Sequence, residues 1–169
     1  MPVTTVTKDP VALTMTVTAE FAATPERVWQ LWADPRKLER WWGPPAYPAT
    51  VVDHELTVGG AVSYFMTGPD GRTSRGWWRV TAVEPPRALE FTDGFADGDG
   101  APLAQSPTTD VTVRLSEHGG RTRMRLQFVF ESPEHMEHVE QLGAFDVFPQ
   151  SVAQMDAVLA ADDPDPEVP

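Results

Sequence analysis

Four residues near the middle of the chain could take part in acid–base chemistry: Asp53, His54, Glu55 and Tyr64. Burial can raise the pKa of a carboxyl group towards neutrality and can keep an imidazole in its neutral, basic form, and either group could then accept a proton in a cyclisation or dehydration. Because side chains alternate between the two faces of a strand, His54 and Glu55 cannot both point inwards, and the sequence leaves open which of them does. The alternation favours a purely structural interpretation, in which Asp53, His54 and Glu55 lie at a solvated strand end and Tyr64 is packed with its hydroxyl hydrogen-bonded.

Arg79 follows two tryptophans, Trp77 and Trp78. An inward arginine could bind a ligand carboxylate through two parallel hydrogen bonds. The cost of burying a charge favours instead a solvated side chain that pairs with a neighbouring strand. One of the two tryptophans should be buried, and the sequence does not say which. His54, Glu55 and Arg79 are therefore the candidate catalytic residues, and no reaction is assigned to them.

A metal site is a third possibility, because His135 and His138 are spaced so that two imidazoles could face one ion from a helix. Glu134 or Glu137 could add an oxygen, but no distant third ligand is evident, and an exposed helix start is the simpler interpretation. The chain has no cysteine. The glycine patterns of P-loops, dinucleotide-binding folds and serine hydrolases do not occur in it. The sequence predicts no metal and no cofactor.

The composition is that of an acidic folded domain: 169 residues, 41% of them hydrophobic, with a formal net charge of −12. Phosphate backbones and anionic lipids would repel such a chain, so neither nucleic acid nor a membrane surface is an expected partner. The lack of cysteine and of an apolar signal segment predicts a cytoplasmic location. We expect a flexible leader at residues 1–10, one domain at 11–161 and a disordered acidic tail at 162–169.

Hydrophobic periodicity predicts a strand over about 11–21, in which Met15 and Val17 alternate with threonines. The motifs Thr24-Pro25-Glu26 and Asp34-Pro35 then predict the starts of two short helices, since threonine and aspartate cap helices and proline suits the first helical position. Further strands are predicted at about 48–57, 61–67, 73–84, 87–93, 109–117 and 121–131.

A helical region closes the chain after Ser132-Pro133-Glu134. An apolar stripe predicts a long helix from about 144–146, with a break near Gly143 and with Pro149 in or just after the first turn. The stripe is Phe145, Phe148, Val152, Met155 and Leu159. These elements predict an α+β fold, a curved seven-stranded antiparallel sheet around a long C-terminal helix with two short helices after strand 1. A sheet curved around one helix leaves space between the two.

Five segments carry a resemblance to a known family. They are FAATPERVWQLWADPRKLERWWGP, ELTVGGAVSYFMTGPDGR, VEPPRALEFT, TDVTVRL and LGAFDVFPQSVAQMDAVL. In this order they resemble the SRPBCC (START/Bet v-type) helix-grip superfamily, and most closely its branch similar to the activator of heat-shock-protein ATPase homologue, which is also described as polyketide cyclase-like. The resemblance implies a helix-grip fold whose sheet encloses a cavity.

The leading hypothesis is that the domain binds a small, mainly hydrophobic molecule in this cavity. The residues expected to contact it are Trp41, Trp42, Tyr64, Met66, Trp78, Phe91, Met124, Phe128, Phe145, Phe148 and Met155. The alternatives are a cofactor-free polyketide cyclase-like or dehydratase-like enzyme and, ranked below it, a stress-related module that interacts with a chaperone. A homodimer is compatible with the sequence, which does not determine the oligomeric state.

Deletion of residues 162–169 should leave the stability of the domain unchanged. The segment DDPDPEVP holds four acids and three prolines, and burial of its one large apolar side chain cannot offset the entropy lost on ordering it. By calorimetry we expect the melting temperature to stay within about a degree or two of that of the full chain, since surface changes rarely exceed about 0.5 kcal/mol. A drop of about ten degrees would show that the segment packs on the domain.

Overall fold

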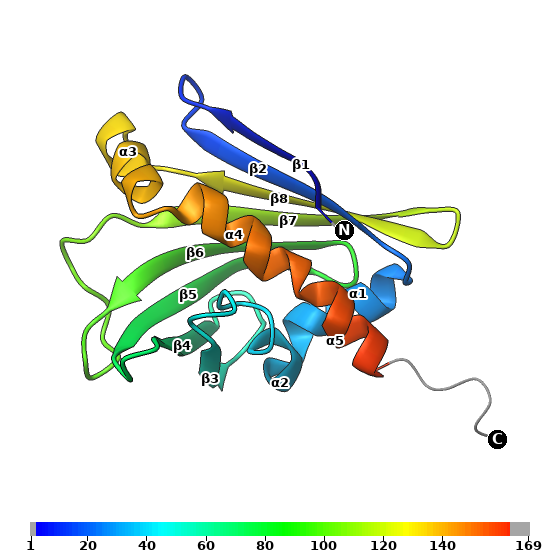
Figure 1. Cartoon of the computed structure of the whole chain (residues 1–169), viewed down its shortest axis with the longest axis horizontal. Helices are drawn as coiled ribbons and strands as arrows, with labels where there is room; N and C mark the ends of the chain where they lie inside the picture. The colour runs from blue at the N-terminus through cyan, green and yellow to red at the C-terminus, as the bar shows by residue number, and fades with distance from the viewer. Residues whose placement is uncertain (1–2, 163–169) are drawn as a thin grey trace.

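A computed structural model describes residues 3–162 and shows one antiparallel sheet of eight strands with helices packed across one face (Figure 1). The strands are β1 (Val3–Asp9), β2 (Thr14–Phe21), β3 (Ala49–His54), β4 (Ala61–Thr67), β5 (Thr73–Glu84), β6 (Ala88–Ala96), β7 (Thr109–His118) and β8 (Arg121–Val129). The helices are α1 (Pro25–Ala33), α2 (Pro35–Leu38), α3 (Pro133–Gln141), α4 (Ala144–Ala153) and α5 (Met155–Asp162). The sheet order is β1-β2-β8-β7-β6-β5-β4-β3. The α+β class is confirmed.

The expectation of seven strands was wrong, because residues 3–9, which fall in the segment expected to be a flexible leader, form the edge strand β1. This strand pairs antiparallel with β2, for example Val6 with Val17. Lys8 also pairs with Glu140 of α3 and lies over the ring of Phe145, 5.6 Å from its centroid. An edge strand exposed along most of its length needs no apolar alternation, which is why the mostly polar segment 4–9 is compatible with a strand.

Three helix starts agree with the capping signals in the sequence. The side chains of Thr24, Asp34 and Ser132 accept hydrogen bonds from backbone N–H groups of the first turns of α1, α2 and α3, and each cap precedes a proline at the first helical position. These caps satisfy donors that the helix itself cannot. The acidic segment beyond Asp162 lies outside the described residues, so its predicted disorder stays a prediction.

The C-terminal helical region is divided, where the sequence suggested one long helix. Gly143, with φ of 82°, separates α3 from α4 as expected, and Pro149 lies in the second turn of α4. The helix is interrupted again at Gln154, whose side-chain amide donates to the backbone oxygens of Gly43 (2.7 Å) and Trp41 (3.3 Å). In Figure 1, α3 lies over one end of the sheet and α5 reaches α1 at the other. None of the helices within residues 3–162 is long and apolar enough to span a membrane.

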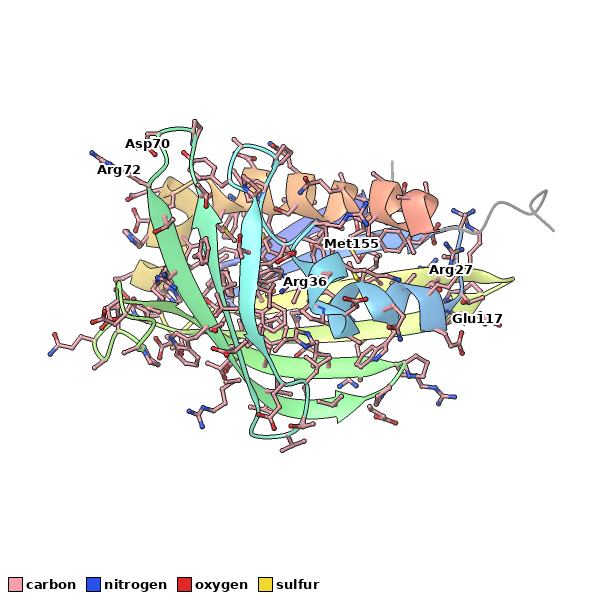
Figure 2. The ribbon with its side chains drawn as sticks, turned by 90° about the horizontal axis from the view of Figure 1, so that it is seen from below. Arg27, Arg36, Asp70, Arg72, Glu117 and Met155 are labelled. Atoms are coloured by element: carbon pink, nitrogen blue, oxygen red, sulfur yellow. The ribbon has the colours of Figure 1, made fainter. Side chains whose placement is uncertain are left out.

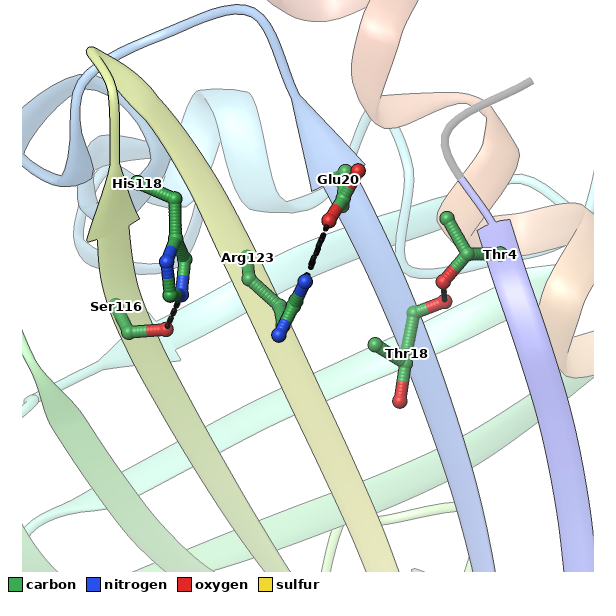
Figure 3. A network of polar contacts seen from close by, with 6 residues as sticks. All are labelled: Thr4, Thr18, Glu20, Ser116, His118 and Arg123. Atoms are coloured by element: carbon green, nitrogen blue, oxygen red, sulfur yellow. Dashed lines mark hydrogen bonds and ion pairs between the residues drawn. The ribbon is translucent and has the colours of Figure 1, made fainter.

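The two faces of the sheet differ in polarity, as the alternating pattern of β2 and β8 predicts. The face away from the helices carries Arg121, Arg123 and Arg125, all exposed, and Arg123 pairs with Glu20 across the strands at 3.0 Å (Figure 3). The sheet bends around the interior that the helices cover, and Met155 of α5, fully buried, points into it (Figure 2).

Aromatic rings fill much of this interior. Trp42 lies within about 6 Å of several of them, including Trp78 (4.8 Å between centroids) and Phe148 (5.4 Å). Trp78 stacks on Phe91 at 3.9 Å with an angle of 16° between the rings. Such contacts add about 0.5–1.5 kcal/mol each to the burial of the rings. The question left open by the sequence is thereby answered, because Trp78 is the buried member of its pair and Trp77 is only partly buried.

Comparing phenylalanine substitutions of two buried tryptophans should measure how much the hydrogen bond of the Trp41 indole contributes to the free energy of unfolding. Trp41 Nε1 donates to the Leu31 carbonyl (2.9 Å), which would otherwise lack a helical partner because the residue four places on is Pro35. Trp32, equally buried, has no partner for its Nε1 within residues 3–162. We expect Trp41→Phe to lower the free energy of unfolding by about 1–3 kcal/mol more than Trp32→Phe, measured in urea. Equal losses would contradict this account.

Candidate functional site

An apolar pocket of about 160 Å³ lies between the concave face of the sheet and the helices α3 and α4. Strands β2, β6, β7 and β8 supply one wall, and the two helices supply the other. The lining residues are Met15, Trp42, Asp93, Gly94, Phe95, Pro107, Thr109, Phe128, Phe130, His135, Val139, Leu142, Ala144 and Phe148. Most are aromatic or aliphatic, and Asp93 and His135 are the titratable members. An apolar cavity with a few convergent polar groups is the usual form of a small-molecule site.

The most polar point of the pocket is the Asp93 carboxyl, which accepts a hydrogen bond of 2.8 Å from the Tyr64 hydroxyl. Burial raises the pKa of Asp93 from 3.8 to about 7, and the hydrogen bond from Tyr64 opposes this only partly. The residue is surrounded by protein atoms but keeps some accessible surface where it lines the pocket. Near neutral pH, Asp93 is therefore present in both its protonated and its ionised forms.

Tyr64 reaches Asp93 across an intervening strand. Tyr64 is on β4 and Asp93 on β6, with Gly76 of β5 paired to Tyr64 and Trp78 paired to Asp93. A Cβ atom on Gly76 would lie 2.3 Å from the Tyr64 hydroxyl, so this position must be glycine for the ring to lie over β5. Burial raises the pKa of Tyr64 well above its ordinary value, and the Asp93 charge and the hydrogen bond to it act in the same direction. Tyr64 thus remains a hydrogen-bond donor.

Two indole N–H groups lie near the Tyr64 oxygen. Those of Trp42 and Trp78 lie near enough to lower the pKa of Tyr64, against the larger effects of burial and of Asp93. Neither N–H group completes a hydrogen bond within the described part of the chain. Buried donors without partners are uncommon in folded proteins. Because Trp42 also lines the pocket, its side chain borders the space open to a ligand.

His135 is the second titratable residue of the pocket. It lies in the first turn of α3, and its Nδ1 accepts a hydrogen bond from the backbone N–H of Glu131 (3.2 Å). Burial lowers the pKa of His135, and the carboxylate of Glu131 only partly opposes this. The ring is therefore neutral near pH 7, with its proton on Nε2. Residues 3–162 contain no group of three or more side chains placed to hold a metal ion.

The candidate catalytic residues lie elsewhere. Glu55 and Arg79 are exposed to solvent, and neither lines the pocket. His54 is half-buried at the end of β3, where its Nε2 donates to the backbone oxygen of Trp32 (2.9 Å). Glu55 and Arg79 thus occupy the solvent-exposed positions predicted from the sequence as the alternative to an inward orientation. The His54 hydrogen bond links β3 to α1.

The residues expected to contact a ligand divide into three groups. Those that line the pocket are Trp42, Phe128 and Phe148. Phe145 lines a neighbouring pocket beside β1. Tyr64 does not line the main pocket but is hydrogen-bonded to Asp93, which does. Those packed around the pocket in the core or beside it are Trp41, Met66, Trp78, Phe91, Met124 and Met155. Asp93, which sequence reasoning did not select, follows Leu89 and Phe91 at two-residue spacing, and this alternation places it on the buried face.

Comparisons with known proteins agree with the fold and the motifs. The family model described as "Activator of Hsp90 ATPase homolog 1-like protein" matches residues 22–160. A solution structure from Arthrobacter aurescens is 49% identical with a TM-score of 0.89, covering 93% of this chain and 91% of the other. A crystal structure from Mycobacterium smegmatis is 46% identical with a TM-score of 0.87, covering 96% and 99%. No functionally curated protein gives a significant match.

Asp93→Asn should stabilise the protein in a pH-dependent way. Between pH 3.8 and about 7 the folded state keeps a proton on Asp93 that the unfolded chain has released, so the stability that this proton provides is lost as pH rises. Relative to Asp93→Asn, the wild type should therefore lose up to about 4 kcal/mol from pH 4 to pH 8, measured by urea unfolding. His135 is present in both proteins, so its titration largely cancels.

Asp110→Asn is the matched control, because this carboxyl is exposed and hydrogen-bonded to Thr92 on the neighbouring strand. The burial of Asp93 would be contradicted if the difference in unfolding free energy between wild type and Asp93→Asn did not change with pH. It would also be contradicted if Asp110→Asn showed the same pH-dependent difference from wild type.

Proposed function

Since the chain belongs to the activator of Hsp90 ATPase homolog 1-like family of the SRPBCC helix-grip superfamily, we propose that it binds a small, mainly hydrophobic molecule in the pocket beside Asp93. Binding of hydrophobic ligands is common in this superfamily. The observation that carries the proposal is an apolar pocket with a single buried acid at its polar point. Transfer of apolar surface from water contributes about 25 cal/mol per Å², so most of the affinity would come from ring and chain contacts.

The size of the pocket limits the ligand. A cavity of about 160 Å³ is close to the roughly 150 Å³ that accommodates a benzene molecule in an engineered apolar cavity. We therefore expect one ring, or a short branched chain, to enter fully. A larger ligand would extend through the mouth or require side chains to move.

The mouth of the pocket supports entry from solvent. Phe95, which is 50% exposed, and Leu142, which is 62% exposed, both line the pocket, one from β6 and one from the end of α3. Pro107, from the glycine-rich and proline-rich loop before β7, completes this edge. Large apolar side chains held in solvent at the edge of a cavity are a common feature of binding sites.

A second candidate function is acid–base catalysis at the same place. Asp93, with a pKa of about 7, could accept or return a proton at neutral pH, while the Tyr64 hydroxyl, which donates to Oδ1, would hold the carboxyl in place. In a cyclase-like or dehydratase-like reaction at this pocket, the pair would take the role first considered for His54, Glu55 and Arg79, which do not line it. The cytoplasmic location, the homodimer and the chaperone interaction remain predictions from the sequence.

Filling the pocket should weaken the binding of an apolar probe. Ala144 lines the pocket at the start of α4, so Ala144→Leu places a larger side chain in the cavity. Ala160→Leu makes the same change at an exposed position of α5. By NMR titration with ethylbenzene we expect saturable binding to the wild type and to Ala160→Leu, and at least about tenfold weaker binding to Ala144→Leu, equivalent to about 1.4 kcal/mol. Equal binding by all three, or no binding by the wild type, would contradict the proposal.

A further inference from the structure

We propose that the pocket selects an organic cation, a small primary amine with one aromatic or branched aliphatic group, and that its ammonium binds the Asp93 carboxylate. This inference rests on the proposed function and specifies the ligand class for the same site. The apolar group would occupy the part of the pocket that Phe128 and Phe148 line, and the amine would bind at the Asp93 oxygens.

The charge of the lining favours a cation over an anion. The residues that form the pocket include one acid, Asp93, and no lysine or arginine. His135 is neutral near pH 7, with its Nδ1 occupied by the backbone N–H of Glu131. A carboxylate or phosphate ligand would thus enter an apolar space without a countercharge, whereas buried charges require one. An ammonium group would find its countercharge at Asp93.

The hydrogen-bonding capacity of Asp93 leads to the same conclusion. A carboxylate has about four acceptor sites. Among residues 3–162, the Tyr64 hydroxyl is the side-chain donor that reaches Asp93, at Oδ1, which leaves sites on both oxygens for a ligand. An ammonium offers three donors and no acceptor, so it fits an acceptor-rich point. Hydrogen bonds between two charged groups are about twice as strong as neutral ones.

Aromatic rings next to the carboxylate add a second attraction for a cation. Trp42, Phe128 and Phe148 line the pocket together with Asp93, with ring centroids 5.4 Å apart for Trp42 and Phe148 and 4.6 Å apart for Phe128 and Phe148. The face of an aromatic ring attracts a cation within about 6 Å of its centre, and the attraction is strongest when water is excluded. The carboxylate and the rings line one pocket, a combination that favours an alkylammonium group.

Binding of a cation should depend on pH with a defined sign. Three titratable side chains face the site: Asp93 of β6, Tyr64 of β4 and His135 of α3. Tyr64 stays protonated, and His135 stays neutral unless the solution is acid. The amine binds the ionised form of Asp93, so its affinity should rise as pH increases through the titration of this carboxyl and then level off while the amine remains protonated.

The test compares four ligands of similar size by calorimetry at pH 8: benzylamine, benzyl alcohol, phenylacetate and ethylbenzene. We expect benzylamine to bind at least about tenfold more tightly than benzyl alcohol and ethylbenzene, and phenylacetate to bind most weakly. Lowering the pH to 5.5 should weaken benzylamine binding about thirtyfold, as the ionised fraction of Asp93 falls, and leave ethylbenzene binding unchanged. Asp93→Asn should remove the preference for benzylamine over benzyl alcohol, whereas Asp110→Asn, at an exposed carboxyl, should retain it.

Three outcomes would overturn the inference, and they can be told apart from a failure of the proposed function. Binding of ethylbenzene with no preference for benzylamine would leave an apolar site without cation selectivity. A preference for phenylacetate would show that the pocket binds an anion instead. A preference for benzylamine that persisted in Asp93→Asn would place the cation elsewhere. If none of the four ligands bound, the proposed function itself would be wrong.

Discussion

The hydrogen bond between Tyr64 and Asp93 is the interaction on which the interior depends. It joins β4 to β6 over β5, and it can form only because Gly76 leaves room for the tyrosine ring. The same bond holds a carboxyl among the rings of Trp42 and Trp78, where an apolar residue would otherwise be expected. A buried acid with one donor is poorly solvated in its ionised form, and this is why the pKa of Asp93 lies near 7.

The divided C-terminal helix explains why space remains beside this acid. At one end, α5 packs on α1, and Arg27 donates to the backbone oxygen of Leu159 (3.0 Å). In the middle, Gln154 ties the helix to the chain that follows α2. At the other end, Gly143 turns the chain so that α3 and α4 meet at an angle over the sheet, and the pocket lies below their junction. A single straight helix would not form the angled junction below which the pocket lies.

Local sequence signals predicted most of the fold and part of the aromatic lining of the pocket, namely Trp42, Phe128 and Phe148, but not its acid. β4 and β5 were predicted at both ends, because alternation and the intervening turn are local, and the helix caps were recognised for the same reason. β1 was missed because an exposed edge strand lacks an apolar face. Asp93 was missed because its importance comes from Tyr64, 29 residues away, through a register across three strands that no local pattern determines.

Stability and function are opposed at Asp93. Above about pH 7 the free protein holds an ionised carboxyl in an aromatic interior, which lowers its stability, and natural proteins commonly retain such groups where function requires them. A bound cation would offset that cost, and any ligand specific to the folded state raises its stability by mass action. Trp42 contacts both the core rings and Phe148 of the pocket wall, so occupancy of the pocket bears directly on the packing of the core. The residue whose ionisation lowers the stability of the protein is therefore the one to which we assign the proposed selectivity of the pocket.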